Sequence, residues 1–97
     1  MKKEINFYYV YILRSLKDGK LYVGYTEDLQ KRIDRHNKGG SFSTKCRAPF
    51  EIIFYEAYRN KYDALRREKY FKSSKGKTTL QSMLREFLGT SSTKKAP

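Results

Sequence analysis

The fold is decided by residues 7–25, which read Phe-Tyr-Tyr-Val-Tyr-Ile-Leu-Arg-Ser-Leu-Lys-Asp-Gly-Lys-Leu-Tyr-Val-Gly-Tyr. Aromatic and β-branched residues fill positions 7–13, which favours a strand buried on both faces over a helix. Asp18-Gly19 is a hairpin turn signal, and residues 21–25 return as the partner strand. The stretch therefore predicts an antiparallel hairpin at the start of the domain.

The register of this hairpin decides which side chains share a face. A turn centred on Asp18-Gly19 would pair Leu16 with Leu21 and Ser15 with Tyr22. This register, or one shifted by two residues, places the same residues on one face: Tyr11, Leu13, Tyr22 and Gly24. Because Gly24 has no side chain, another backbone or a ligand can come close to that face.

Two helices and a third strand are expected next. Residues 26–28, Thr-Glu-Asp, provide a cap and acidic residues for a helix from Leu29 to about Lys38, which Gly39-Gly40 ends. A strand follows from Phe50 to Tyr55 and continues towards Tyr58, and a second helix begins at about Lys61.

The rest of the chain predicts one more helix and a tail. Thr78 or Thr79 can cap a helix with an apolar stripe, which consists of Leu80, Met83, Leu84, Phe87 and Leu88. A chain of 97 residues has room for one core. We expect an N-terminal extension over 1–6, one domain over 7–88 and a disordered tail over 89–97. The fold class is α/β (α+β), with a three-stranded antiparallel sheet flanked by helices in the order β-β-α-β-α-α.

The composition is strongly basic, with 22 Lys and Arg against 10 Asp and Glu and a formal net charge of +12. This charge exceeds what solubility requires and indicates a polyanionic partner, either nucleic acid or an acidic membrane surface. Nine Tyr and six Phe, many beside Lys or Arg, favour nucleic acid, because such surfaces combine base stacking with phosphate contacts. The alternative is that the basic residues only solvate the surface. We expect DNA rather than RNA as the partner, no membrane, and a monomer.

Cysteine content and hydropathy argue against a disulfide-linked, secreted, membrane-spanning or zinc-binding protein. Cys46 is the only cysteine, so no internal disulfide can form, and no apolar run reaches the length of a signal segment or a membrane span. One His and one Cys are too few for a structural zinc site. A cytoplasmic protein is therefore expected.

The first helix places two polar residues beside its apolar stripe. At 100° per residue, Leu29, Arg32, Ile33 and His36 fall within one arc. Arg32 and His36 are either functional groups or boundary residues whose stems pack while their polar ends reach water.

The loop over 40–49 is rich in hydrogen-bonding and basic side chains. Among them, Thr44, Lys45 and Arg47 are candidates for contacts with a phosphate backbone. Loops of this composition also commonly just connect two elements.

The second helix carries a carboxylate on the side that must pack on the sheet. Glu68 lies on one arc with Ala64 and Phe71. A carboxylate in this position needs a partner, which could be Arg32 in a structural ion pair or a divalent metal. Off this arc lie three basic residues that are candidates for phosphate contacts: Arg66, Arg67 and Lys69.

Taken together, these segments resemble the GIY-YIG nuclease superfamily. Tyr9-Val10-Tyr11 looks like the first motif element and Tyr22-Val23-Gly24 like the second. The run over 24–32 and the Ala-Leu-Arg-Arg-Glu run over 64–68 lie at the expected separation, and the match extends over about 7–88. The resemblance is greatest to small single-domain members, which are related to the catalytic domain of the excision-repair nuclease subunit.

The resemblance implies a metal-dependent endonuclease that hydrolyses phosphodiester bonds in DNA by nicking or structure-selective cleavage. Glu68 would hold one Mg²⁺ or Mn²⁺ ion that contacts the scissile phosphate. Tyr11 would activate or position the attacking water, and Tyr22 would assist by hydrogen bonding. Arg32 would neutralise charge on the phosphorane, and His36 stands where relatives carry His or Tyr near the nucleophile.

Two expectations follow, and there is one departure from the family pattern. All five of these side chains should meet in one cleft on the exposed part of the sheet. Positive charge, including that of Arg32, should favour the phenolate of Tyr11. Many members also have an asparagine about a dozen residues after the glutamate, and residues 72–81 contain none.

The alternatives to an endonuclease are a non-catalytic DNA- or RNA-binding module with this fold, and a small basic protein that recruits an acidic partner.

Overall fold

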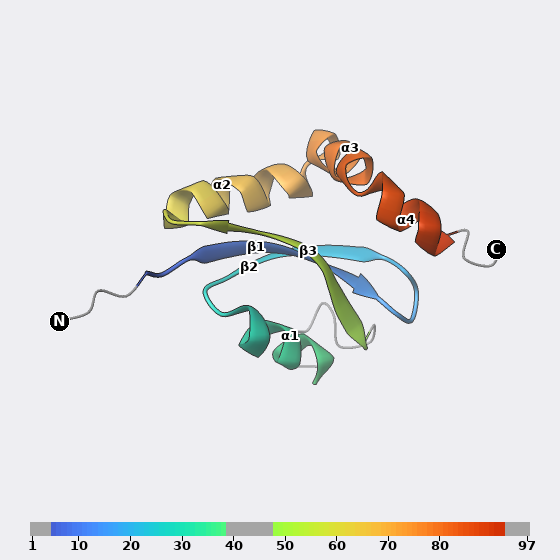
Figure 1. Ribbon diagram of the computed structural model, residues 1–97, viewed down its shortest axis with the longest axis horizontal. Helices are drawn as coiled ribbons and strands as arrows, with labels where there is room; N and C mark the ends of the chain where they lie inside the picture. Colours follow the sequence, from blue (N-terminus) through green and yellow to red (C-terminus); the bar gives the residue numbers. More distant parts are fainter. Residues whose placement is uncertain (1–4, 39–47, 93–97) are drawn as a thin grey trace.

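The structure is a computed structural model that describes residues 5–38 and 48–92 (Figure 1). These residues form a three-stranded sheet and four helices. In chain order they are β1 (Tyr8–Ser15), β2 (Leu21–Thr26), α1 (Leu29–Asn37), β3 (Phe50–Tyr58), α2 (Lys61–Lys72), α3 (Ser74–Met83) and α4 (Arg85–Ser92). The predicted α+β class and order are confirmed, with two helices where one last helix was expected.

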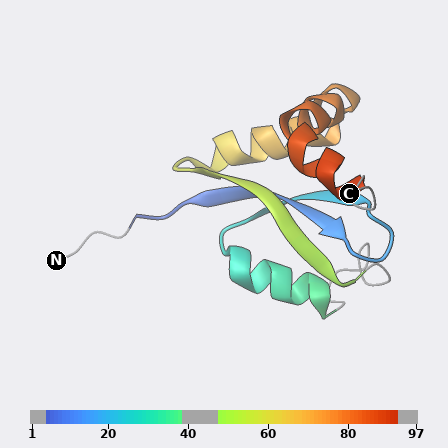
Figure 2. The same cartoon turned by 45° about the vertical axis from the view of Figure 1, so that its right-hand side comes forward.

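The sheet is antiparallel with β1 at its centre, in the order β2-β1-β3. Helix α1 covers one face of the sheet, and α2 and α3 lie on the other (Figures 1 and 2). Consecutive β1 residues from Val10 to Leu13 are buried, as expected for a central strand between two helical layers.

The hairpin register differs by two residues from the one predicted. Tyr22 pairs with Leu13 rather than with Ser15, because the connection is longer than a two-residue turn. The amide of Gly19, whose φ is +76°, donates to the carbonyl of Ser15 at 2.8 Å. This register places Tyr11 directly opposite Gly24, and the predicted grouping on one face is confirmed.

Helix α1 is capped at its start and bonded to the sheet at its end. Its N-cap is Asp28, whose Oδ1 accepts from the amide of Lys31 at 3.1 Å. At the other end, Asn37 Oδ1 accepts from the amide of Phe50 at 2.6 Å, which ties α1 to the start of β3. The C-terminal end of α1 is therefore held against β3.

The C-terminal part differs from the prediction in where its helices begin. Ser73 caps α3 by accepting from the amide of Gly76 at 3.0 Å, so α3 begins several residues before Thr78. The chain turns at Leu84, and α4 then runs to Ser92, through the first part of the predicted tail. Residues 93–97 lie outside the described residues.

Each face of the sheet has its own hydrophobic core. On the α2 side the buried residues are Val10, Ile12, Ala64, Phe71 and Leu80. On the α1 side they are Tyr11, Leu13 and Phe50, against which Leu29 and Ile33 pack. Tyr11 thus belongs to the core beneath α1.

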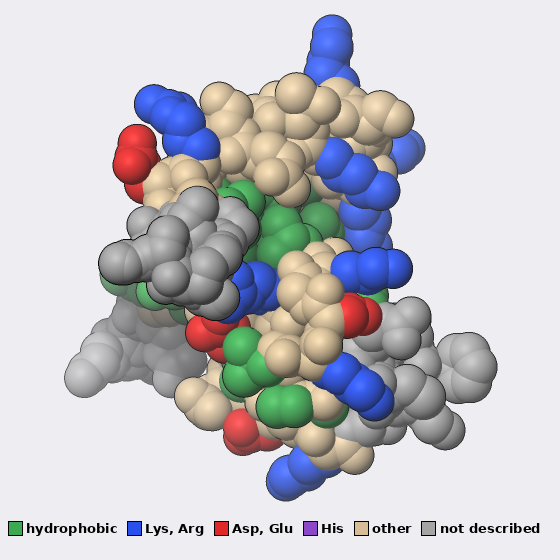
Figure 3. All heavy atoms as spheres, turned by 90° about the vertical axis from the view of Figure 1, so that its right-hand side faces the viewer, with side chains coloured by type: hydrophobic (Ala, Val, Ile, Leu, Met, Phe, Trp, Pro, Cys, Tyr) green, Lys and Arg blue, Asp and Glu red, His purple; other side chains and the backbone are tan. Residues whose placement is uncertain are grey.

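The end of the molecule near α4 is less completely packed. The guanidinium of Arg14 lies 5.5 Å from the ring centre of Phe87, which links α4 to β1. Figure 3 shows hydrophobic side chains in a hollow on this side of the molecule, with Lys and Arg side chains around it. Among the described helices, none has the length and apolar content that crossing a membrane requires.

Candidate active site

The centre of the candidate site is a contact between β1 and α1. The hydroxyl of Tyr11 lies 3.0 Å from Nε2 of His36, and the two rings meet edge to face. Tyr11 is 3% exposed and His36 8% exposed. The phenol lies directly over Gly24, where an added methyl group would overlap its Cζ and hydroxyl.

Two arginines of α1 surround this pair. Arg32 donates from Nη1 to the carbonyl of Tyr25 at 3.3 Å, and it also acts on Tyr11 through its charge and through hydrogen bonding. Arg35, one turn further on, contributes positive charge to both Tyr11 and His36. The sequence reasoning missed Arg35, although its position three residues after Arg32 could have indicated it.

Burial determines the protonation of the Tyr11–His36 pair. Desolvation raises the pKa of Tyr11 above its usual value, and the charge of Glu68 adds to this, although Arg32 and Arg35 oppose it. Burial, with help from both arginines, lowers the pKa of His36. Both groups are therefore neutral near pH 7, and Nε2 of His36 can accept the phenolic proton.

This finding corrects one expectation. Positive charge was predicted to favour the phenolate of Tyr11, but the loss of solvation on burial outweighs the effect of Arg32. A phenolate can form here only if its proton has somewhere to go, and His36 is the acceptor in contact with it.

Tyr22 lies on the same side of the sheet as Tyr11. Its ring meets that of Phe50 edge to face at 5.4 Å between centres, and it packs on the core beneath α1. Tyr22 is half-buried, so its side chain is more accessible than that of Tyr11.

Glu68 comes from the other helical layer. It belongs to α2, which covers the face of the sheet opposite α1 (Figure 1). The side chain is 21% exposed, and its Oε2 lies 3.0 Å from Nζ of Lys72. Its charge nevertheless raises the pKa values of Tyr11 and Tyr25, so the carboxylate acts on the site across β2.

The residues present fit a loosely held divalent ion. Within the described ranges, no three His, Cys, Asp or Glu side chains are grouped as a metal cage. Mg²⁺ is commonly bound by one or two carboxylates together with water and substrate phosphates, so Glu68 alone is compatible with it. A structural zinc site, which needs about four protein ligands, does not fit.

The predicted phosphate contacts on α2 are only partly available. Arg67 makes two bonds to the carboxylate of Glu56, at 2.9 and 3.2 Å, and its guanidinium stacks 4.3 Å from the ring centre of Phe71. It was predicted to project away from the core, but the apolar ring and the acidic residue of β3 hold it against the sheet. Arg66 pairs with Asp63 at 2.8 Å, and Lys69 is exposed.

The loop candidates Thr44, Lys45 and Arg47 lie outside the described residues.

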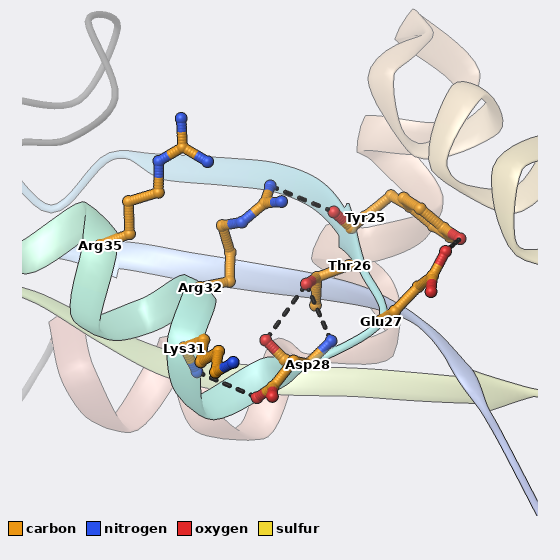
Figure 4. A pocket seen from close by; sticks show the side chains of 7 residues that line it. All are labelled: Tyr25, Thr26, Glu27, Asp28, Lys31, Arg32 and Arg35. Atoms are coloured by element: carbon orange, nitrogen blue, oxygen red, sulfur yellow. Dashed lines mark hydrogen bonds between the residues drawn. The ribbon is translucent and has the colours of Figure 1, made fainter.

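Next to the catalytic candidates, a groove of about 460 Å³ opens between β2 and α1. Figure 4 shows the groove, with the guanidinium groups of Arg32 and Arg35 directed to the same side of α1. The residues that line it are Tyr25, Thr26, Glu27, Asp28, Lys31, Arg32 and Arg35.

Comparison with known proteins defines the class to which this fold and site belong. The family model of the GIY-YIG catalytic domain matches residues 7–81. The chain therefore belongs to the GIY-YIG family, and the resemblance inferred from its motifs is confirmed.

Within that class, the chain is similar to UPF0213 proteins. The chain is 46% identical over 69 residues to the UPF0213 protein of Pediococcus pentosaceus, which covers 70% of this chain and 72% of the relative. It is 44% identical over 70 residues to the UPF0213 protein YazA of Bacillus subtilis, with 71% and 70% covered. The solution NMR structure of a UPF0213 protein from Bacillus halodurans is 40% identical, with a TM-score of 0.50 over 79% of this chain and 84% of that one.

Proposed function

We propose that the protein is a metal-dependent endonuclease that hydrolyses phosphodiester bonds in DNA, by nicking or structure-selective cleavage. The observation that carries this proposal is the buried hydrogen bond between the Tyr11 hydroxyl and Nε2 of His36, with Arg32 beside it. A buried tyrosine in contact with a neutral base and an arginine is suited to proton transfer next to an anionic substrate.

The proton path follows from the two pKa shifts. As water attacks phosphorus, the Tyr11 oxygen accepts a proton from the water and passes its own proton to Nε2 of His36. The bond from phosphorus to the leaving oxygen breaks, which leaves a phosphate monoester and an alkoxide; the alkoxide takes a proton from solvent water to become an alcohol, and His36 then returns its extra proton to the solvent. Because His36 is held neutral, it is ready to receive the proton near pH 7.

Arg32 supplies the electrostatic part of catalysis. Its guanidinium is planar and permanently charged, so it can bind two non-bridging oxygens and stabilise the charge that develops on them. Tyr22 is half-buried on the same face, and it would donate a hydrogen bond to the substrate. A divalent ion held by Glu68 would add Lewis-acid stabilisation of the scissile phosphate.

The choice of nucleic acid as substrate rests on charge. The net charge of +12 favours a polyanion. Together with membership of a nuclease family, this charge supports DNA as the substrate.

A second candidate is a non-catalytic DNA- or RNA-binding module that keeps the nuclease fold. Two observations favour it: Glu68 is already paired with Lys72, and residues 72–81 contain no asparagine. Both functions predict salt-dependent binding, and only the enzyme predicts cleavage.

The experiment that separates them uses the full chain with Mg²⁺ on duplex, nicked, branched and single-stranded DNA. Tyr11→Phe should lower the cleavage rate by about 10²–10⁴-fold, the usual contribution of acid–base catalysis. Tyr62→Phe is the matched control, because Tyr62 is 70% exposed on α2. If the wild type binds these substrates but cleaves none of them, the binding module is favoured.

A further inference from the structure

The outer side of α1 carries a row of cations that continues from Arg32. The groove beside Arg32 is also lined by Lys31 and Arg35. These two residues line an adjoining hollow as well, of about 430 Å³, together with Asp34 and Lys38. The two depressions share Lys31 and Arg35, so they form one continuous surface from Arg32 to the end of the helix.

Among the described residues, no carboxylate neutralises the cations of this surface. Within residues 5–38 and 48–92, no carboxylate forms an ion pair with the side chain of Lys31, Arg35 or Lys38. On α2, by contrast, Arg66, Arg67 and Lys72 are each paired with an acidic residue. The positive charge of α1 therefore remains available to a partner, whereas much of that on α2 is neutralised.

The positions of the acidic residues determine how the electrostatic potential changes along this surface. Glu27 and Asp28 lie at the start of α1, where Asp28 caps the helix and Glu27 accepts from the hydroxyl of Tyr25 at 3.3 Å. Asp34 is the one acidic residue further along, and it accepts from Nε2 of Gln30 at 3.1 Å. The potential thus becomes more positive from the start of the helix towards Lys38.

We propose that Lys31, Arg35 and Lys38 bind successive phosphates of the substrate strand to one side of the scissile bond. The inference rests on the proposed function in one respect, that Arg32 marks the scissile phosphate. Lys31 and Lys38 are about 10.5 Å apart along the helix axis at 1.5 Å per residue. DNA has one phosphate per about 3.4 Å of axis on each strand, so this length spans about three phosphate-to-phosphate steps, and each of the three long side chains can reach a different phosphate.

The surface recognises the backbone and not the bases. Lys and Arg side chains that contact phosphates fix the register of a strand without reading its sequence. The α1 surface would therefore position the strand at Arg32 and Tyr11, whatever its sequence.

The test compares two triple variants of the full chain, both made in a Glu68→Gln background so that no cleavage occurs. One variant removes the α1 cations through Lys31→Gln, Arg35→Gln and Lys38→Gln. The control removes three exposed cations of α2 and α3 through Lys61→Gln, Lys75→Gln and Lys77→Gln. Binding of a fluorescein-labelled duplex is measured by anisotropy at several salt concentrations, and circular dichroism checks that both variants are folded.

For the α1 variant, the slope of log K against log salt should fall in magnitude by about 2.7, since each contact contributes about 0.9. The control variant should keep the wild-type slope within about one unit. The proposal would be overturned if the slope fell equally in the two variants, or if it did not fall in the α1 variant. If the wild type binds through α1 but never cleaves DNA, the proposed function fails while this surface stands.

Discussion

The hydroxyl of Tyr11, in the central strand, lies 3.0 Å from Nε2 of His36, on the helix that covers that face of the sheet. The contact depends on local features of both elements. Gly24 leaves room for the phenol, and the bond between Asn37 and Phe50 holds the end of α1 against β3. Burial then raises the pKa of one partner and lowers that of the other, which makes the pair a donor and an acceptor at neutral pH.

The pKa of His36 should lie below the usual 6.5. The chain has one histidine, so a single imidazole Hε1 resonance reports its titration by NMR. Arg35→Gln should move the pKa back towards 6.5, because the charge of Arg35 helps to lower it. Lys31→Gln, on the same helix, should leave it unchanged. A wild-type pKa at or above 6.5 would contradict the buried, neutral state.

Protein stability should depend on pH through the same residue. Below pH 6.5 the unfolded chain binds a proton on His36 that the folded chain does not, so the free energy of unfolding falls as pH decreases through the lowered folded pKa. Urea unfolding between pH 7.5 and 5.5 measures this fall, and His36→Gln should remove it. Equal slopes in the two proteins would show that another group is responsible.

Gly24→Ala should damage the site through packing. The added methyl would overlap the Tyr11 ring, and overpacking of this kind costs about 1–3 kcal/mol of stability. Because the ring must move, the upfield or downfield shift that it imposes on the His36 resonance should change as well. Gly89→Ala is the control, since Gly89 has no atom within 4 Å of an added Cβ and lies in α4, where alanine should stabilise by about 0.5–1 kcal/mol.

Much of the fold could be predicted from local patterns. The aromatic run of β1 and the Asp-Gly turn predicted the hairpin, and periodicity predicted α1 and α2. The register and the C-terminal helices could not be obtained in this way. They depend on particular hydrogen bonds, those of Ser15 in the turn and Ser73 at the start of α3, which compete with other equally plausible caps and turns.

The candidate site was predictable in its residue types and less so in its geometry. Helical periodicity placed Arg32 and His36 on the inner side of α1, and the hairpin placed Tyr11 and Tyr22 on one face. Periodicity predicts which side of α2 faces the sheet but not which face of the sheet α2 covers, so it could not show that Glu68 comes from the layer opposite α1. The sign of the Tyr11 pKa shift depends on burial, which only the packed structure reveals.

Arg67 should contribute to stability rather than to DNA binding. Arg67→Gln removes two bonds to Glu56 and the stacking on Phe71, and it should cost about 1–3 kcal/mol in urea unfolding. Arg66→Gln should cost about 0.5 kcal/mol or less, because that side chain is 75% exposed in its pair with Asp63. A stable Arg67→Gln protein whose salt dependence of DNA binding is reduced would show that Arg67 contacts phosphates.

The most direct test of the proposed catalytic site is Mg²⁺-dependent DNA cleavage by the wild type, Glu68→Gln and Glu86→Gln, with DNA binding measured in parallel. Glu86 is the control, since its side chain is 95% exposed on α4. We predict that Glu68→Gln abolishes cleavage and leaves affinity unchanged or slightly higher, because it removes a metal ligand and a charge that repels phosphate. Glu86→Gln should cleave at the wild-type rate. Cleavage at the wild-type rate by Glu68→Gln would contradict the role of Glu68 as the metal ligand.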